Sequence, residues 1–415
     1  MISQMNKIRC TLFVMLVVVM LLPAAHALTW QEALSLADKN NNQINSARRQ
    51  ADSSYWSYNK AMTNFLPQVS ANLGASKSDN KTTSTISKAY SYGLSATQTI
   101  FKGFQNYFSL ISARIQYEYD KAGLDNTKAN VFYDLRTAFT DVFIAQETIK
   151  VQEKILARRK ENAKLIDLRY KSGIEDKGNM MLTKANEVQS QHDLNSAKRS
   201  LELAKLNLSQ MIEASVDAVE ISIIPDKTVK LDVDKVMVSA PTYIMAQKQL
   251  DSADINKKAT ISEFLPNVSV SGSLSKSGSS WPPSTDSNSL SLSMSYSLFP
   301  GGSNITDAYI NSINYDKALQ DFENNKQTIR YGLESAVSNF ADAIEALSAS
   351  NTIFAAKAER AKINQARYMN GLVRYDEWDR IENDAINASM SLLSNKRNSL
   401  YSEAALYKSY GGWIK

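Results

Sequence analysis

The sequence has little of what most enzymes and disulfide-bonded domains are built from. Its 415 residues include one cysteine, Cys10, and two histidines, His26 and His192. So few of these residues exclude a disulfide framework and a His/Cys metal cluster. We also find no glycine-rich phosphate loop and no G-x-S-x-G motif. The sequence therefore predicts a protein without catalytic activity, cofactor or metal site.

Glycine and proline are also scarce, with 14 and 8 residues. Because turns depend on these residues, their scarcity favours long uninterrupted elements over a compact body with many loops. The formal net charge is +5, and it is +3 without residues 1–27, which carry Lys7 and Arg9 but no acid. Such a small charge does not indicate nucleic-acid binding.

The N-terminal segment predicts export. Lys7 and Arg9 precede the apolar run Leu12–Leu22, and an A-x-A site follows at Ala25–Ala27. This order is typical of a secretory signal peptide, here residues 1–27. A membrane anchor is the alternative, but the run is much shorter than the ~20 residues that a spanning helix needs. No later stretch approaches the length of a membrane helix, so the exported chain is either soluble or embedded as a β-barrel.

The chain contains an internal duplication. Three segments recur at offsets of 198 or 199 residues: Phe65–Ser70 as Phe264–Ser269, Ile100–Gly103 as Leu298–Gly301, and Leu168–Gly173 as Ala366–Gly371. Three landmarks kept in step over such a distance indicate a repeat. We therefore treat the mature chain as one unit of two repeats, residues 28–208 and 244–415, joined by a connector at residues 209–243.

Each repeat contains a predicted β-hairpin, at about residues 68–101 and 267–299. In Ser289–Phe299 every second residue is serine, and the residues between are apolar. Ala89–Phe101 alternates in a similar way. Segments of ~10 residues with one apolar and one polar face match the strands of transmembrane barrels, in which one face meets lipid and the other meets water. Half of a soluble β-sandwich is the alternative.

The remainder predicts long helices. Neither Phe104–Tyr170 nor Thr306–Tyr368 contains proline, and ~65 helical residues make a rod of about 100 Å. Apolar residues follow coiled-coil spacing from Leu135 to Leu156, and again in a second ladder. That ladder consists of Leu194, Ala197, Leu201, Ala204, Leu208 and Met211. We interpret the charged run Arg158–Glu161 as a solvated helix face, and His192 as an exposed surface residue.

Four strands in one chain cannot close a barrel. In lipid, the open edges would leave backbone N–H and C=O groups unpaired, which costs several kcal/mol for each group. Closure therefore needs strands from other subunits. Two chains give eight strands, which side chains nearly fill, whereas three give twelve strands and a wider lumen. The serine-rich face would then line an aqueous passage that the helices continue.

Together these features resemble the TolC-like outer-membrane efflux protein family over nearly all of the mature chain. The matching motifs are Leu28–Leu34, the two Phe-Leu-Pro sites before strands, and the Tyr-x-x-Gly segments Tyr170–Gly173 and Tyr368–Gly371. The resemblance implies a mainly α fold with a membrane β-barrel, in which a homotrimer completes twelve strands above a long antiparallel coiled-coil tunnel. It also implies an equatorial region formed by residues 209–243 and the chain ends.

The resemblance further implies a function and a place in the cell. Members are outer-membrane channels of tripartite efflux or type I secretion systems in Gram-negative bacteria, and they extend into the periplasm. Their partners are a periplasmic adaptor (membrane fusion) protein and an inner-membrane pump of RND or ABC type. They have no enzymatic activity and no cofactor, and they contact outer-membrane lipid rather than nucleic acid. A soluble periplasmic coiled-coil adaptor or scaffold is the alternative, although such a protein has no reason to carry amphipathic strands.

In this family the helix-to-helix turns form the periplasmic entrance, which corresponds here to Gly173–Met180 and Gly371–Asp379. We expect the turn glycines to be Gly173 and Gly371. The candidates for a cation-selective acidic ring are Asp376, Glu377 and Asp379, because three copies in a narrow mouth would concentrate cations. The alternative is that these acids pair with Arg374 and Arg380 on the helix exterior.

A second hypothesis concerns the closed state of the entrance. Basic and aromatic groups beside acids can hold neighbouring helices together by hydrogen bonds. The candidates for such a latch are Arg367, Tyr368, Arg374 and Tyr375.

Overall fold

The computed structural model describes residues 27–80, 85–220, 224–225, 227 and 231–414. The predicted signal peptide, residues 1–27, lies outside the described residues except for Ala27. The chain divides into two compact units, of which unit 1 is drawn from Met1–Gln43, Lys128–Leu231 and Glu334–Lys415. Unit 2 comprises Ile44–Thr127 and Asp232–Leu333.

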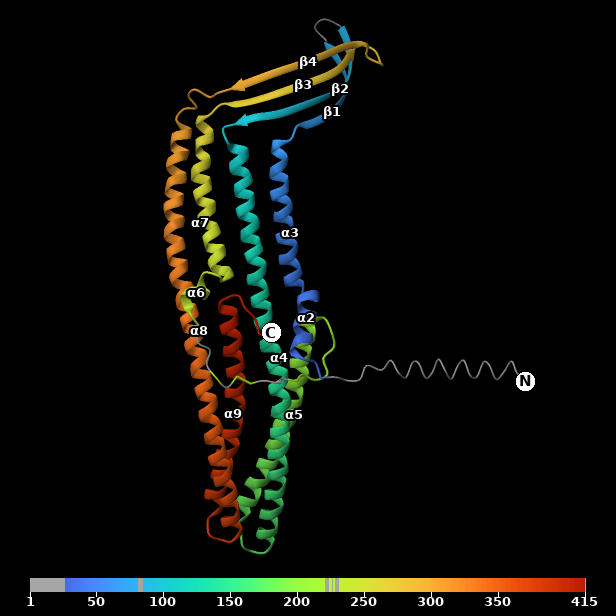
Figure 1. The fold of residues 1–415 in the computed structure, drawn as a ribbon. Coiled ribbons are helices and arrows are strands. Elements are labelled where there is room, and N and C mark those ends of the chain that lie inside the picture. Colours follow the sequence, from blue (N-terminus) through green and yellow to red (C-terminus); the bar gives the residue numbers. More distant parts are fainter. Residues whose placement is uncertain (1–26, 81–84, 221–223, 226, 228–230, 415) are drawn as a thin grey trace, which may run out of the picture. The chain divides into compact units, whose positions relative to one another are not determined.

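Unit 2 contains a four-stranded antiparallel sheet whose order follows the sequence (Figure 1). Its strands are β1 (Gln68–Asn80), β2 (Thr85–Lys102), β3 (Asn267–Gly278) and β4 (Thr285–Ser295). The helices that flank the strands all lead to one end of the sheet, because each hairpin turns back toward its start (Figure 1). They are α3 (Asn42–Met62), α4 (Gln105–Lys171), α7 (Pro241–Ala259) and α8 (Ser303–Met369), and the short helix α6 (Val233–Met237) precedes α7.

The Phe-Leu-Pro sites convert helix into strand. The 3-10 turns η1 (Thr63–Phe65) and η2 (Thr260–Phe264) end at Leu66 and Leu265. Both leucines are extended, with φ/ψ of −104/151° and −124/151°. A residue before proline is driven out of the helical region by the proline ring, so the chain leaves each site extended. The Phe-Leu-Pro tripeptide therefore precedes a strand in both halves of the chain.

The sheet has one apolar and one hydroxyl-rich face, as the alternation predicts. On the apolar face Leu73 is 74% exposed and Leu290 is 81% exposed. On the other face, serine hydroxyls meet across strand pairs at 2.8 Å, as in Ser271 with Ser291 and Ser273 with Ser289. The apolar face is therefore uncovered in a single chain, whereas several hydroxyls of the polar face pair with one another.

The fourth strand is shifted from its expected bounds. β4 begins at Thr285 and ends at Ser295, so it stops before Phe299, where we expected it to end. Ser295 pairs with Asn267, the first residue of β3. Pro266 precedes Asn267 and has no N–H to donate, so the ladder has no further partner. The alternating pattern of Tyr296–Phe299 therefore lies past the start of β3, where no residue remains to pair with it.

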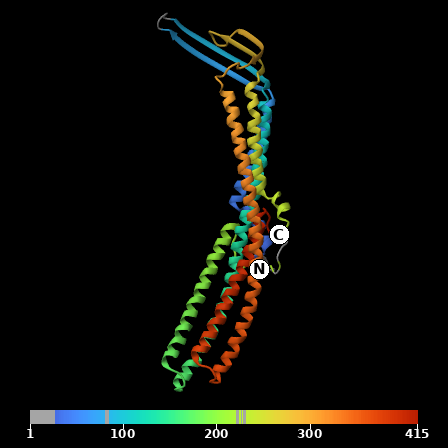
Figure 2. The ribbon, with the colours of Figure 1, turned by 90° about the vertical axis from the view of Figure 1, so that its left-hand side faces the viewer.

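Unit 1 is built from long helices that lie side by side (Figures 1 and 2). They are α5 (Lys177–Ile212), α9 (Tyr375–Ser409), and the parts of α4 and α8 that belong to this unit. The two expected long helices are confirmed, since α4 and α8 each contain 67 residues. Leu135, Phe139 and Leu208 from the apolar ladders are fully buried. His192 lies on the surface, with its side chain 67% exposed.

The segments near both chain ends meet in unit 1. Helix α2 (Trp30–Asn40) begins with a capping box, in which the Thr29 side chain accepts from the Glu32 backbone and Glu32 accepts from Thr29. The indole of Trp30 donates to the carbonyl of Ile414 at 2.7 Å. Leu28 forms a parallel bridge with Val219. These contacts tie the start, the middle and the end of the described chain together.

None of the helices in the described ranges is both long enough and apolar enough to span a membrane.

Candidate functional site

Two helix-to-helix turns of unit 1 share one backbone geometry. Gly173 and Gly371 both have φ of +72°. In the first turn Gly173 N–H donates to Tyr170 and Ile174 N–H donates to Arg169; in the second, Gly371 and Leu372 donate to Tyr368 and Arg367. This is the Schellman arrangement, which needs a left-handed residue and therefore favours glycine. The Tyr-x-x-Gly motif thus ends α4 and α8 in the same way.

The next helices start differently. At α5, the Asp176 side chain caps the helix by accepting from the Asn179 backbone. At α9 the N-cap residue, Arg374, provides no side-chain cap, and Asp376 and Glu377 occupy the first turn. Negative charge there is favourable because the helix N-terminus carries a partial positive charge. These two acids therefore have a local stabilising role in addition to any role in conduction.

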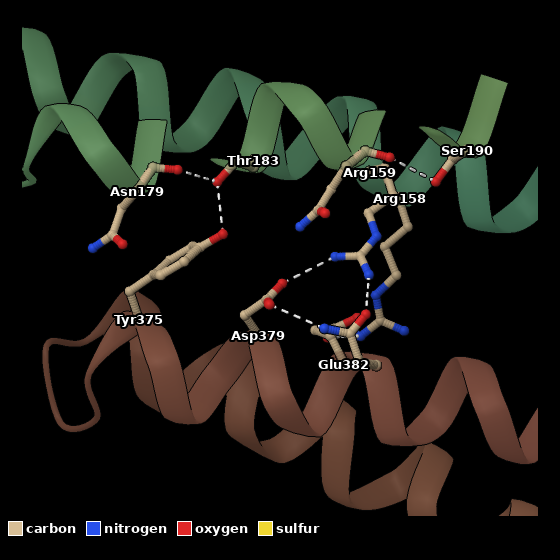
Figure 3. A network of polar contacts seen from close by, with 10 residues as sticks. Arg158, Arg159, Asn179, Thr183, Ser190, Tyr375, Asp379 and Glu382 are labelled. Atoms are coloured by element: carbon tan, nitrogen blue, oxygen red, sulfur yellow. Dashed lines mark hydrogen bonds and ion pairs between the residues drawn. The ribbon is translucent and has the colours of Figure 1, made fainter. Parts of the chain in front are cut away.

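The three predicted acids do not lie together. Asp376 and Glu377 are exposed, and Asp376 pairs with Arg374 at 3.2 Å. This pair corresponds to the exterior pairing that we considered as the alternative. Asp379 instead points toward α4 and pairs with Arg159 at 3.1 Å (Figure 3).

The four predicted latch residues also separate into two groups. Arg367 and Arg374 are exposed, whereas Tyr368 and Tyr375 are buried. The Tyr368 ring stacks on Trp378 with a centroid separation of 4.5 Å and an interplanar angle of 6°. Ile166 of α4 completes this buried cluster. The two tyrosines therefore lie inside one protomer, packed between helices.

Each buried phenol is directed to a specific partner in the α4–α5 turn or in α5. Tyr368 donates to Glu175 at 2.6 Å, and Arg169 lies 4.8 Å from the centre of the Tyr368 ring. The hydroxyls of Tyr375 and Thr183 are 2.8 Å apart. Because Thr183 donates to the carbonyl of Asn179, Tyr375 is the donor in that pair (Figure 3). Burial raises the pKa of both tyrosines, and for Tyr368 the bond to Glu175 adds to the rise.

A charged cluster lies one turn further along α9. Arg159 is 6% exposed and donates to Asp379 and to the Asn383 side chain, the latter at 2.5 Å. Arg158 pairs at 2.5 Å with Glu382, whose side chain is 2% exposed. Burial raises the pKa of Glu382 even though both arginines pull it down. Burial therefore outweighs the attraction of the close ion pair.

This cluster corrects our interpretation of Arg158–Glu161 as a solvated face. Lys160 and Glu161 are exposed, but Arg159 is buried against α9. The local sequence reads as a charged run, and the partner acids lie more than 200 residues away. One signal was present: Asp379, Glu382 and Asn383 are spaced i, i+3 and i+4, which places three polar side chains on one helix face. The residues 198 positions earlier are Met181, Lys184 and Ala185, which do not repeat this pattern.

In the part of the chain that the structure describes, no group of three or more His, Cys, Asp or Glu residues could hold a metal ion.

Comparison with known proteins identifies the family to which this arrangement belongs. The sequence profile of the outer membrane efflux protein family matches residues 33–213 and 233–412. The chain belongs to this family.

Individual relatives are distant. The chain is 23% identical to the outer membrane efflux protein BepC of Brucella suis biovar 1 (strain 1330) over 270 residues, which cover 61% of this chain and 56% of that protein. It is 21% identical to the toxin and drug export protein A of Aggregatibacter actinomycetemcomitans over 402 residues, covering 90% of this chain and 84% of that protein. The match thus spans little more than half of BepC.

A solved structure has the same fold. The Campylobacter jejuni CmeC outer membrane channel superimposes with a TM-score of 0.82 at 14% identity, covering 93% of this chain and 86% of that one. The superposition shows that the two chains share a fold. The protein is thus a Gram-negative outer-membrane protein that extends into the periplasm.

Proposed function

We propose that the protein is the passive outer-membrane duct of a tripartite efflux or type I secretion system and works as a homotrimer. The observation that carries this proposal is the sheet, which has one uncovered apolar face, one serine-rich face and two unpaired edges. The edges are β1 and β4, and their outward N–H and C=O groups need partners in lipid. Three copies would close twelve strands around the serine face.

The helices provide the periplasmic part of the proposed duct. We assign them to two structural repeats, residues 28–208 and 244–415, with residues 209–243 as the equatorial connector. The equal lengths of α4 and α8, and the identical Schellman turns at Gly173 and Gly371, support this assignment. The partners would be a periplasmic adaptor and an inner-membrane pump of RND or ABC type. The protein would conduct its cargo without catalysis and without a cofactor.

Two measurements test the duct. The mature protein, extracted in detergent, is expected to have the mass of a trimer and to form ion-conducting pores in planar bilayers. A monomer that remained dissolved in buffer without detergent would overturn the proposal and would favour the soluble adaptor instead.

The entrance is proposed at the α8–α9 turn, with Asp376 and Glu377 as its cation-selective acids and Asp379 held back by Arg159. Both exposed acids lie at the turn, where three copies would surround a narrow mouth. The Asp376→Ala/Glu377→Ala variant is expected to lose cation preference in planar bilayers. An unchanged preference would remove these acids from the selectivity site.

Burial separates the four candidate latch residues into two pairs. Tyr368 would fasten α8 to the α4–α5 turn through Glu175, and Tyr375 would fasten α9 to α5 through Thr183. The exposed Arg367 and Arg374 would face a neighbouring copy or solvent. Tyr368→Phe/Tyr375→Phe removes both hydroxyls and keeps the rings. We expect this variant to raise resting conductance; unaltered conductance would place the latch elsewhere.

A further inference from the structure

The hairpin end of the sheet carries a pair of like charges. β1 and β2 pair in a register that places Lys77 directly opposite Lys88. Like charges opposite each other destabilise an antiparallel pair. Both side chains are exposed. Asp79 follows two residues after Lys77 on the same face and offsets part of this repulsion. An anion between the two ammonium groups would remove the rest.

The pair lies on the apolar face of the sheet. Alternate residues of a strand share a face, so Lys77 lies on the face of Val69 and Leu73. Lys88 lies on the face of Leu94, which pairs with both Ala71 and Leu274. If the sheet is inserted as proposed, both lysines therefore face the surrounding lipid rather than the passage.

Along this face, the side chains change from apolar to aromatic to basic, starting from the end of the sheet nearest the helices. At the helix end, the row formed by Phe101, Val268 and Met294 is apolar. Toward the hairpin turns, Trp281 packs against Tyr90 and Tyr92 with ring separations of 6.2 and 6.0 Å. Aromatic girdles mark the membrane interfaces of transmembrane strands. By the strand register, the lysine pair lies beyond these rings, toward the β1–β2 turn.

The spacing agrees with the thickness of a membrane. From Phe101 to Tyr92 the strand rises about 30 Å at ~3.3 Å for each residue, or about 23 Å along the membrane normal at a tilt of ~40°. The apolar band of such proteins is about 25 Å tall. Lys88 lies roughly 10 Å further out by the same arithmetic, which is the depth of charged headgroups in the outer leaflet.

A third lysine lies on the same face, four residues nearer the helix end of the sheet than the pair. Lys276 lies opposite Tyr92 in the β2–β3 register, and it pairs with Asp286 at 3.2 Å while its side chain stays 43% exposed. An ammonium has three donors, so the ion pair leaves capacity for a second acceptor.

We propose that Lys77, Lys88 and Lys276 bind the phosphate groups of a phosphorylated glycolipid in the outer leaflet. This inference rests on the proposed insertion of the sheet into the outer membrane. The arrangement suits a lipid with more than one phosphate, because two lysines lie opposite each other and the third lies further along the sheet. The rings of Tyr90 and Trp281 lie between the Lys77–Lys88 pair and the apolar band, where the sugar and the upper acyl chains would be, and Lys276 lies level with Tyr92.

The experiment uses the full-length protein in mixed micelles, titrated with bisphosphorylated lipid A, dephosphorylated lipid A or phosphatidylglycerol and monitored by native mass spectrometry. The wild type is expected to prefer the bisphosphorylated lipid. Lys77→Ala/Lys88→Ala should weaken that binding roughly 30-fold, and Lys77→Arg/Lys88→Arg should retain it. Lys102→Ala is the matched control, because Lys102 lies on β2 at the helix end and its loss should leave binding unchanged.

Several results would overturn the inference. They are equal binding of the three lipids by the wild type, unchanged affinity in Lys77→Ala/Lys88→Ala, and an equal loss in Lys102→Ala. The lipid comparison on the wild type decides the matter even if the double variant does not assemble. Planar-bilayer conductance separates this test from the proposed function: a protein that conducts but ignores the phosphates refutes only the lipid site, whereas one that forms no pore refutes the duct.

Discussion

At the scale of single residues, Arg159 joins α4 to α9 through two polar side chains. Arg159→Ala would leave Asp379 and Asn383 without their donor in a largely buried setting. Removing one partner of a buried pair typically costs about 3 kcal/mol, so we expect a clearly lower melting temperature by circular dichroism. Lys160→Ala is the control, because Lys160 is the exposed neighbour and surface changes stay within about 0.5 kcal/mol. Equal melting temperatures for the two variants would contradict a structural role for Arg159.

The stability of the folded protein should depend on pH through Glu382, in a direction that follows from its raised pKa. Burial raises its pKa in the folded protein, so the folded state holds this proton more tightly than the unfolded state does. The contribution of Glu382 to stability is then greatest below the pKa of the unfolded chain, and it is lost as the pH rises through the folded pKa. Glu382→Gln cannot titrate. The melting temperature of the wild type relative to this variant should therefore be higher at pH 5 than at pH 8.

Other carboxyl groups do not disturb this comparison. Burial also raises the pKa of Glu403, but Glu403 is present in both proteins and its contribution cancels. A wild-type advantage that grew with rising pH would show that the ion pair with Arg158, rather than burial, controls the titration of Glu382.

At the scale of elements, the sequence predicts what depends on local pattern. The long helices follow from the absence of proline over Phe104–Tyr170 and Thr306–Tyr368, and the sheet faces follow from period-two alternation. The end of β4 could not be predicted in this way, because it is set by Pro266, which precedes the first residue of the partner strand β3. Arg159 was misread for the same reason: its burial depends on Asp379, and no local pattern connects residues so far apart.

Two glycine-to-alanine substitutions, one at a helix-to-helix turn and one inside a helix, test the role of the turn glycine. Gly371 has φ of +72° and an added Cβ would meet no atom within 4 Å, so Gly371→Ala is strained by its backbone alone. We expect a loss of about 1 kcal/mol. Gly332 of α8 also has open space but no positive φ, so Gly332→Ala should gain up to ~1 kcal/mol from helix propensity. Opposite shifts in melting temperature are the expected result; a loss in both variants would mean that hidden packing controls these sites.

At the scale of the whole molecule, the two faces of the sheet determine which solvent each residue meets. The predicted mature chain contains no cysteine, so a single introduced thiol reports on its own surroundings. Ser291 and Leu292 are neighbours on β4 that point to opposite faces, and both are exposed in one chain. In the assembled duct, the first would face the aqueous passage and the second would face lipid.

Cysteine variants of these neighbours test the assembly itself. A charged, membrane-impermeant thiol reagent needs thiolate and water, so it should modify Ser291→Cys from the passage. The modification should lower single-channel conductance, because the three attached groups narrow the lumen. Leu292→Cys should remain unmodified in the bilayer but react once the protein is unfolded. If both positions reacted equally in the bilayer, water would reach both faces of the sheet. Lipid would then not cover the apolar face, and the strands would not be enclosing a channel.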